Sequence, residues 1–95
     1  MTNKEDYRSI ETTGLRALAW VVCDERLGTR LLALTGMDAD TLKARAAEPA
    51  TLAAVIAFLA DHEPDLIACA KALDMTPEAV VKAGKILSRG VPARE

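Results

Sequence analysis

Apolar side chains recur every three or four positions along most of the chain, which is the spacing of an α-helix that packs on one face. The least polar stretch is LRALAWVVCDERLGTRLLALTG, residues 15–36. Two helices are predicted there, with a sharp break at Asp24, because a short acidic side chain suits the N-cap of a helix. The apolar part before Asp24 is too short for a membrane span, which needs about 20 apolar residues.

The helix before this break is apolar on nearly every side, which is typical of a helix buried by several neighbours. Arg16 is its one strongly polar residue. A turn of about 100° per residue puts Trp20 nearly opposite the main apolar stripe, and that stripe is Leu15, Leu18, Ala19 and Val22. We therefore expect the stripe to face inward and the helix to lie at the centre of the fold.

The same helix is predicted to begin further upstream, with Tyr7, Ile10 and Leu18 on its inner side. Gly14 interrupts this series at a cost of about 1 kcal/mol relative to alanine. A glycine there marks either a kink or a close approach of another backbone. The close approach fits a central helix better.

Capping residues and prolines mark the other predicted helix boundaries. The expected N-caps are Asn3 (with a later start at Ser9 or Thr13 as the alternative), Asp24, Asp38 and Thr76. Prolines suited to the first turn are Pro49, Pro64 and Pro77, and the glycines expected to end helices are Gly36 and Gly90.

Each predicted helix after Asp24 carries its own inward stripe. These stripes are, in chain order, Leu27, Leu31 and Leu34; Leu42 and Ala46; Leu52, Val55, Ile56 and Leu59; Leu66, Ile67, Cys69, Ala70 and Leu73; and Val80, Ala83, Gly84 and Leu87. The predicted fold class is therefore all-α, a compact orthogonal bundle of five to six short helices. With 95 residues the chain has room for one domain, assigned to residues 1–90 with a flexible C-terminal tail at 91–95.

Two segments 38 residues apart resemble each other: residues 32–46, LALTGMDADTLKARA, and residues 70–84, AKALDMTPEAVVKAG. Each contains a helix end, a methionine, a capping residue, an acidic first turn and an inward apolar residue. The bundle is thus predicted to contain two similar helix-turn-helix units. A duplication and two independent turns of the same type both explain the match.

Charge and composition restrict the function. The net charge of −2 gives no general attraction to nucleic acid, so a nucleic-acid partner is not expected. The polar start, MTNKEDYRS, lacks the apolar core of a signal peptide, and no membrane segment is found, so we expect a cytoplasmic protein. Cys23 and Cys69 are isolated in apolar stretches and are predicted to be reduced and to act as small hydrophobic residues.

Motifs of enzymes are absent from the sequence, and we expect no catalytic site, cofactor, metal or small-molecule substrate. The one histidine, His62, stands between Asp61 and Glu63. Consecutive residues at a helix end point in different directions, so we interpret these three as a solvated acidic turn.

A partner surface is the function that the sequence favours, and it centres on Trp20. Arg16, Trp20 and Asp24 recur every four residues on one side of the predicted central helix. Tryptophan is enriched at the energetic centres of protein interfaces, and Arg16 can stack on the ring. The alternative for Trp20 is an ordinary core position. We expect the ring to be partly buried at an edge and predict a protein-interaction or self-associating module.

A small DNA-binding regulator is the alternative function. Residues 70–87 fit part of a DNA-binding helix-turn-helix pattern, with a turn at Asp74. The helix after this turn offers Lys82, Lys85 and Arg89 to phosphates. Three cations are few for useful affinity, and Glu78 stands at the end that would contact bases.

The chain also resembles a known family over roughly residues 15–87. The matching features are Ala-Leu-Ala-Trp before Asp-Glu, the LALTG segment that ends at Gly36, a proline-led middle helix and the closing LDMTPE turn at residues 73–78. They are similar to a family of small bacterial helical proteins that is catalogued only as a domain of unknown function. The resemblance implies a compact all-helical fold, with no assigned activity and no family site residues to transfer.

Overall fold

The computed structural model describes residues 4–89, with side chains from residue 7 onward. These residues form six helices: α1 (Lys4–Cys23), α2 (Glu25–Thr35), α3 (Ala39–Ala44), α4 (Pro49–Ala60), α5 (Glu63–Ala72) and α6 (Pro77–Ser88). No strand occurs within residues 4–89, so the predicted all-α class is confirmed. The predictions for Asn3, Gly90 and residues 91–95 lie outside the described residues. Because α1 begins at Lys4, the early start is correct and the later starts at Ser9 or Thr13 are wrong.

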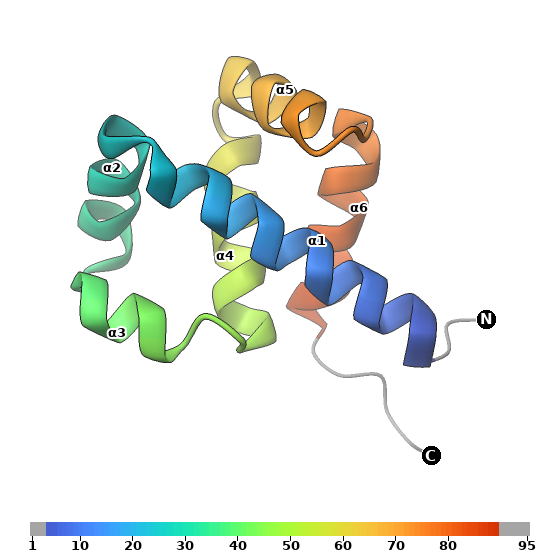
Figure 1. Cartoon of the computed structure of the whole chain (residues 1–95), viewed down its shortest axis with the longest axis horizontal. Helices are drawn as coiled ribbons and strands as arrows, with labels where there is room; N and C mark the ends of the chain where they lie inside the picture. The colour runs from blue at the N-terminus through green and yellow to red at the C-terminus, as the bar shows by residue number, and fades with distance from the viewer. Residues whose placement is uncertain (1–3, 90–95) are drawn as a thin grey trace.

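The core lies where α1 crosses α4 and α6, which run side by side behind it (Figure 1). Six of the twelve residues of α4 are buried, more than in any other described helix. The side chains with almost no exposed surface include Leu52, Ile56, Leu59, Val80 and Leu87. The apolar stripes predicted for α4 and α6 are thus confirmed.

A close approach at Gly14 is confirmed, although the approaching atoms belong to the side chains of Leu52 and Leu87 and not to another backbone as predicted. A Cβ atom at this position would lie 2.9 Å from Cβ of Leu52 on α4. Helix α1 is continuous through Gly14, so the glycine serves packing and produces no break.

The inward stripe predicted for α1 is correct for Leu18 and wrong for its other members, whereas the predicted central position agrees with the packing of α1 against α2, α4, α5 and α6. Its buried residues from the second turn on are Gly14, Ala17, Leu18 and Val21, whereas Leu15 is 42% exposed and Val22 48% exposed. The smallest side chains allow the closest approach, so α1 turns Gly14 and Ala17 towards α4 and α6. Helix α1 crosses in front of α4 and α6 (Figure 1), and its side chains Leu15 and Val22 stay partly exposed.

Side-chain caps start the helices where the sequence predicted them. The backbone N–H of Leu27 donates to Asp24 at 3.0 Å, and that of Thr41 donates to Asp38 at 2.7 Å. Thr76 Oγ1 accepts from the N–H of Ala79 at 3.1 Å. Each bond satisfies a backbone donor that the first helical turn leaves unpaired.

The two similar segments share their turn geometry. Gly36 has a φ of 76°, and Asp74, the residue 38 positions later, has a φ of 61°. Both are followed after one residue by an N-cap, Asp38 or Thr76. The units differ in their second helices, because α3 has 6 residues and α6 has 12.

Two large apolar residues that the sequence predicts to face inward are exposed in the structure. Leu34 is 67% exposed and Ile67 47% exposed, so both predictions are wrong. The first turns of α2 bury Leu27 and Leu31, whereas Leu34 in its last turn lies at the surface, where it lines a shallow hollow together with Phe58 of α4. Ile67 lies one residue beyond the buried position of Leu66, on the outer side of α5.

Candidate functional site

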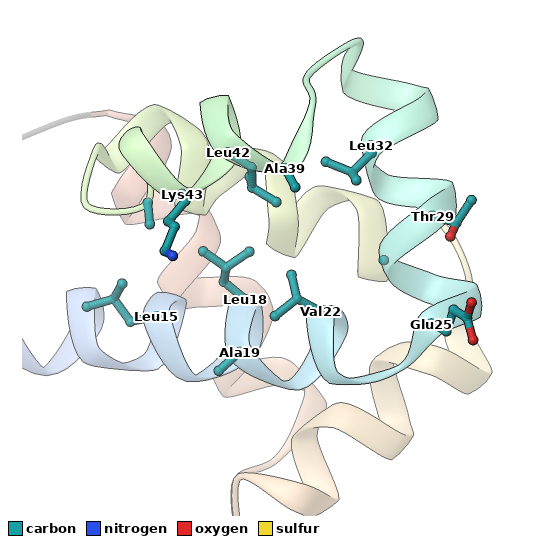
Figure 2. Close-up of a pocket in the computed structure, with 12 residues that line it drawn as sticks. Leu15, Leu18, Ala19, Val22, Glu25, Thr29, Leu32, Ala39, Leu42 and Lys43 are labelled. Carbon is teal, nitrogen blue, oxygen red and sulfur yellow. The ribbon is translucent and has the colours of Figure 1, made fainter.

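An apolar groove lies among α1, α2 and α3 (Figure 2). Its volume is about 600 Å³. Most lining residues are apolar, and those that matter below are Leu15, Leu18, Ala19, Val22, Leu32, Leu42 and Ala46. We call this feature the α1–α3 groove.

The groove exists because α3 stands away from α1. The residue after α2, Gly36, is left-handed, and Asp38 then starts α3 in a new direction. Helix α3 buries one side chain, Leu42, and it supplies one wall of the groove. The face of α1 that carries Leu15 and Val22 is therefore uncovered.

The charged residues of the groove lie at its two ends. Lys43 of α3 lies near Leu15, whereas Glu25 of α2 lies beyond Val22 (Figure 2). Both side chains are exposed. Among the described residues, ion pairs join Asp65 to Arg30 and to His62. Neither Lys43 nor Glu25 forms an ion pair within this part of the chain.

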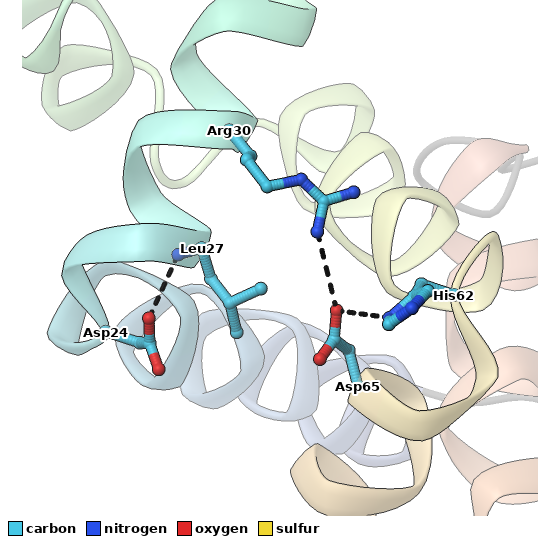
Figure 3. Close-up of polar contacts among 5 residues, drawn as sticks. All are labelled: Asp24, Leu27, Arg30, His62 and Asp65. Carbon is cyan, nitrogen blue, oxygen red and sulfur yellow. Dashed lines mark hydrogen bonds and ion pairs between the residues drawn. The ribbon is translucent and has the colours of Figure 1, made fainter.

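The predicted partner surface at Trp20 lies on the other flank of α1. Trp20 is partly buried and packs against the core, as expected, while Arg16 is exposed. The Asp24 carboxylate is engaged, since it accepts the Leu27 N–H (Figure 3). The cation–π contact within the described residues is a different one, with Arg30 5.7 Å from the ring centre of Phe58.

His62 belongs to a polar contact that the sequence analysis missed. Its Nδ1 atom lies 2.7 Å from Asp65 Oδ2, and Arg30 Nη1 of α2 lies 3.9 Å from the same oxygen (Figure 3). Asp65 is three residues after His62, the usual spacing of neighbours at a helix start. The contact links α2 to α5. Within residues 4–89 no group of three or more His, Cys, Asp or Glu side chains could hold a metal ion.

The cations proposed for DNA lie on α6. Lys82, Lys85 and Arg89 are exposed, as is Glu78 at the beginning of the helix. The turn before α6 contains Asp74 in the left-handed region, which glycine usually occupies. An Asp tolerates this conformation better than most residues.

The two cysteines differ in environment. Cys69 is fully buried, and burial raises the pKa of its thiol to about 11, although the positive charge of Arg16 acts in the opposite direction. Both cysteines are free thiols. Cys23 is exposed at the end of α1, so its predicted role as a small core residue is wrong. The sequence placed it in an apolar run, but the run ends at the surface.

Of the groove residues that the sequence predicts to face inward, Leu18 and Leu42 are buried, whereas Leu15, Ala19 and Val22 are exposed. The stripe of Leu15, Ala19 and Val22 was the detectable signal, and it was interpreted as core. These residues lie near α3 because of the turn between α2 and α3, and no local sequence pattern predicts this proximity.

Fold and surface together define a small all-α protein with an open apolar groove and with no helix, among those described, long and apolar enough to cross a membrane. Residues 8–90 match the family model described as protein of unknown function (DUF3572), and the chain belongs to this family. No curated protein and no solved structure gives a significant match. The resemblance to a family of unknown function is thereby confirmed.

Proposed function

We propose that this chain is a non-enzymatic, cytoplasmic protein-interaction module that binds its partner in the α1–α3 groove. The observation that carries the proposal is the exposure of Leu15 and Val22, at 42% and 48%, beside the buried side chains of Leu18 and Leu42, which also line the groove. Large apolar side chains that adjoin in an exposed hollow mark interaction sites, because burying them releases about 25 cal/mol for each Å².

The shape of the groove favours a helix as the bound element. Three helices form its floor and walls, and its apolar residues on α1 recur with helical spacing. An amphipathic helix lays its apolar face into such a groove. The surface of Arg16, Trp20 and Asp24, which the sequence favours, stays the alternative prediction for the partner surface.

Photo-crosslinking in cells tests the groove. A photoreactive amino acid replaces Ala19, an exposed residue on the groove floor, and in a matched variant it replaces Ala54, an exposed alanine on α4. We expect a protein adduct from position 19 and none from position 54. Equal adducts from both positions, or none from position 19, would contradict the proposal.

DNA regulation is the second candidate function. It is favoured by the three exposed cations Lys82, Lys85 and Arg89, which follow the α5–α6 turn on one face of α6. Under the main proposal, the protein shows no salt-sensitive binding to mixed-sequence duplex DNA in a titration at physiological ionic strength. Binding that strengthens as salt falls, and that the triple alanine variant at these positions abolishes, would favour the DNA-binding function.

A further inference from the structure

We infer that the partner in the α1–α3 groove is a second copy of this chain, with the two α1 helices antiparallel across a two-fold axis near Ala19. This inference rests on the proposed function and names the partner for the same groove. Most small homo-oligomers are two-fold dimers in which one surface patch meets itself. The patch must therefore be complementary to its own image after a half-turn.

The charges of the groove meet this condition. Lys43 lies at the Leu15 end and Glu25 at the Val22 end (Figure 2). A two-fold axis between these ends brings Lys43 of one copy to Glu25 of the other, and the same pair forms a second time by symmetry. A parallel arrangement of the two α1 helices would instead place equal charges together, which is unfavourable.

The apolar residues meet the same condition. Leu15, Ala19 and Val22 follow the i, i+4, i+7 spacing of a helix–helix contact, and all three are exposed. In the antiparallel arrangement Leu15 packs beside Val22 of the other copy, and the two Ala19 residues meet at the axis. Alanine at the crossing point lets two helices approach closely. From Leu15 to Val22 the contact spans about 10 Å of helix.

An interface of this length is small. Stable protein interfaces bury about 800 Å² on each partner, and weak, transient ones bury less. We therefore expect a dimer that dissociates in the micromolar range and whose population changes with protein concentration. Sedimentation equilibrium of the full chain over a concentration series measures this directly.

Charge reversal provides the specific test. The single variants Lys43→Glu and Glu25→Lys each place equal charges opposite one another twice, so each should weaken dimerisation by about tenfold or more. The double variant exchanges both charges and should restore association to near the wild-type value. Raising the salt concentration to about 1 M should reduce the differences, because screening shortens to about 3 Å.

A matched control uses the same changes outside the groove. Glu78 is the acidic residue of the first turn of α6, as Glu25 is of α2, and Lys71 is in the last turn of α5, as Lys43 is of α3. Glu78→Lys and Lys71→Glu should leave dimerisation unchanged. Thermal denaturation of every variant separates a loss of association from a loss of folding.

Val22→Lys tests the apolar part, with Ile67→Lys as the control, since the two side chains are 48% and 47% exposed. Only Val22→Lys should make the protein monomeric. A wild-type protein that stays monomeric at high concentration overturns this inference, as does a double charge variant that fails to regain association. If the Ala19 adduct then contains a different protein, the proposed function stands without the dimer; if position 19 forms no adduct, both fail.

Discussion

Ile56 on α4 occupies the space that a side chain at Gly84 on α6 would need: a Cβ atom at position 84 would lie 2.6 Å from Ile56 Cγ2. Cβ atoms essentially never lie this close to a neighbour, so the Ile56 side chain or one of the two helices would have to shift. We expect Gly84→Ala to lower the free energy of unfolding by about 1–3 kcal/mol, as overpacking does in other cores. Urea denaturation measures the change.

Gly28→Ala is the matched control for this substitution. Gly28 is also helical, but the nearest atom to its added Cβ is Val22 Cα at 3.6 Å, an ordinary contact. Alanine there should raise stability by up to about 1 kcal/mol, because it favours helix more than glycine does. An equal loss in both variants would contradict the close packing of α4 on α6.

Leu59 tests the α4 stripe. Its side chain is fully buried, so Leu59→Ala should cost about 2–5 kcal/mol through lost burial and the cavity that remains. Leu34→Ala makes the same change at a side chain that is 67% exposed and should alter stability by less than about 0.5 kcal/mol. Similar melting temperatures for the two variants would show that Leu59 is not in the core.

Trp20→Ala distinguishes the two flanks of α1. Because the ring packs partly buried against the core, we expect a loss of about 2 kcal/mol in unfolding free energy, below that of a fully buried tryptophan. Self-association, corrected for the folded fraction, should be unchanged. Weaker association at an unchanged melting temperature would instead make Arg16, Trp20 and Asp24 the partner surface.

The cysteines should react very differently. Cys69 is buried with a thiol pKa of about 11, so almost none of it is thiolate near neutral pH, whereas Cys23 is exposed. Iodoacetamide should therefore add one label to the native protein and two after denaturation, and Cys23→Ser should remove the native label. Rapid double labelling of the native chain would contradict the burial of Cys69.

The cap of α3 should make stability depend on pH. The backbone N–H of Thr41 donates to the Asp38 carboxylate and, with the Thr41 side chain, holds the pKa of Asp38 below its ordinary 3.8. A lowered pKa in the folded state contributes stability that is fully present above the unfolded pKa and is lost as pH falls through the folded pKa. At neutral pH the wild-type protein should therefore have a higher melting temperature than the Asp38→Ala variant, and this difference should decrease as the pH is lowered.

Asp40→Ala is the control for this experiment, since Asp40 follows the cap in the same first turn and is exposed. At neutral pH the melting temperature of Asp40→Ala should differ less from that of wild type than the melting temperature of Asp38→Ala does. If the difference in melting temperature between wild type and Asp38→Ala stayed constant down to about pH 2, this would contradict the role of the Asp38 cap.

The helix boundaries followed from the local sequence. Asp24, Asp38 and Thr76 each cap a backbone N–H three residues further on, so the interaction is contained in one short segment. Gly36 and the prolines act through their own backbone angles. The stripes of α4 and α6 were equally clear, because large apolar side chains recur at helical spacing in each helix, as Leu52, Ile56 and Leu59 do in α4.

The buried face of α1 and the candidate site could not be predicted from the local sequence. The sequence of α1 offers two apolar faces, one with the larger side chains Leu15 and Val22 and one with Gly14, Ala17 and Val21. Periodicity favours the larger residues, but close packing on Leu52 required the smaller ones. Which face becomes core depends on the surfaces that α4 and α6 bring to it from residues 26 or more positions away in the chain. Local pattern thus established the six helices, while the meeting of distant helices left Leu15 and Val22 uncovered and created the groove.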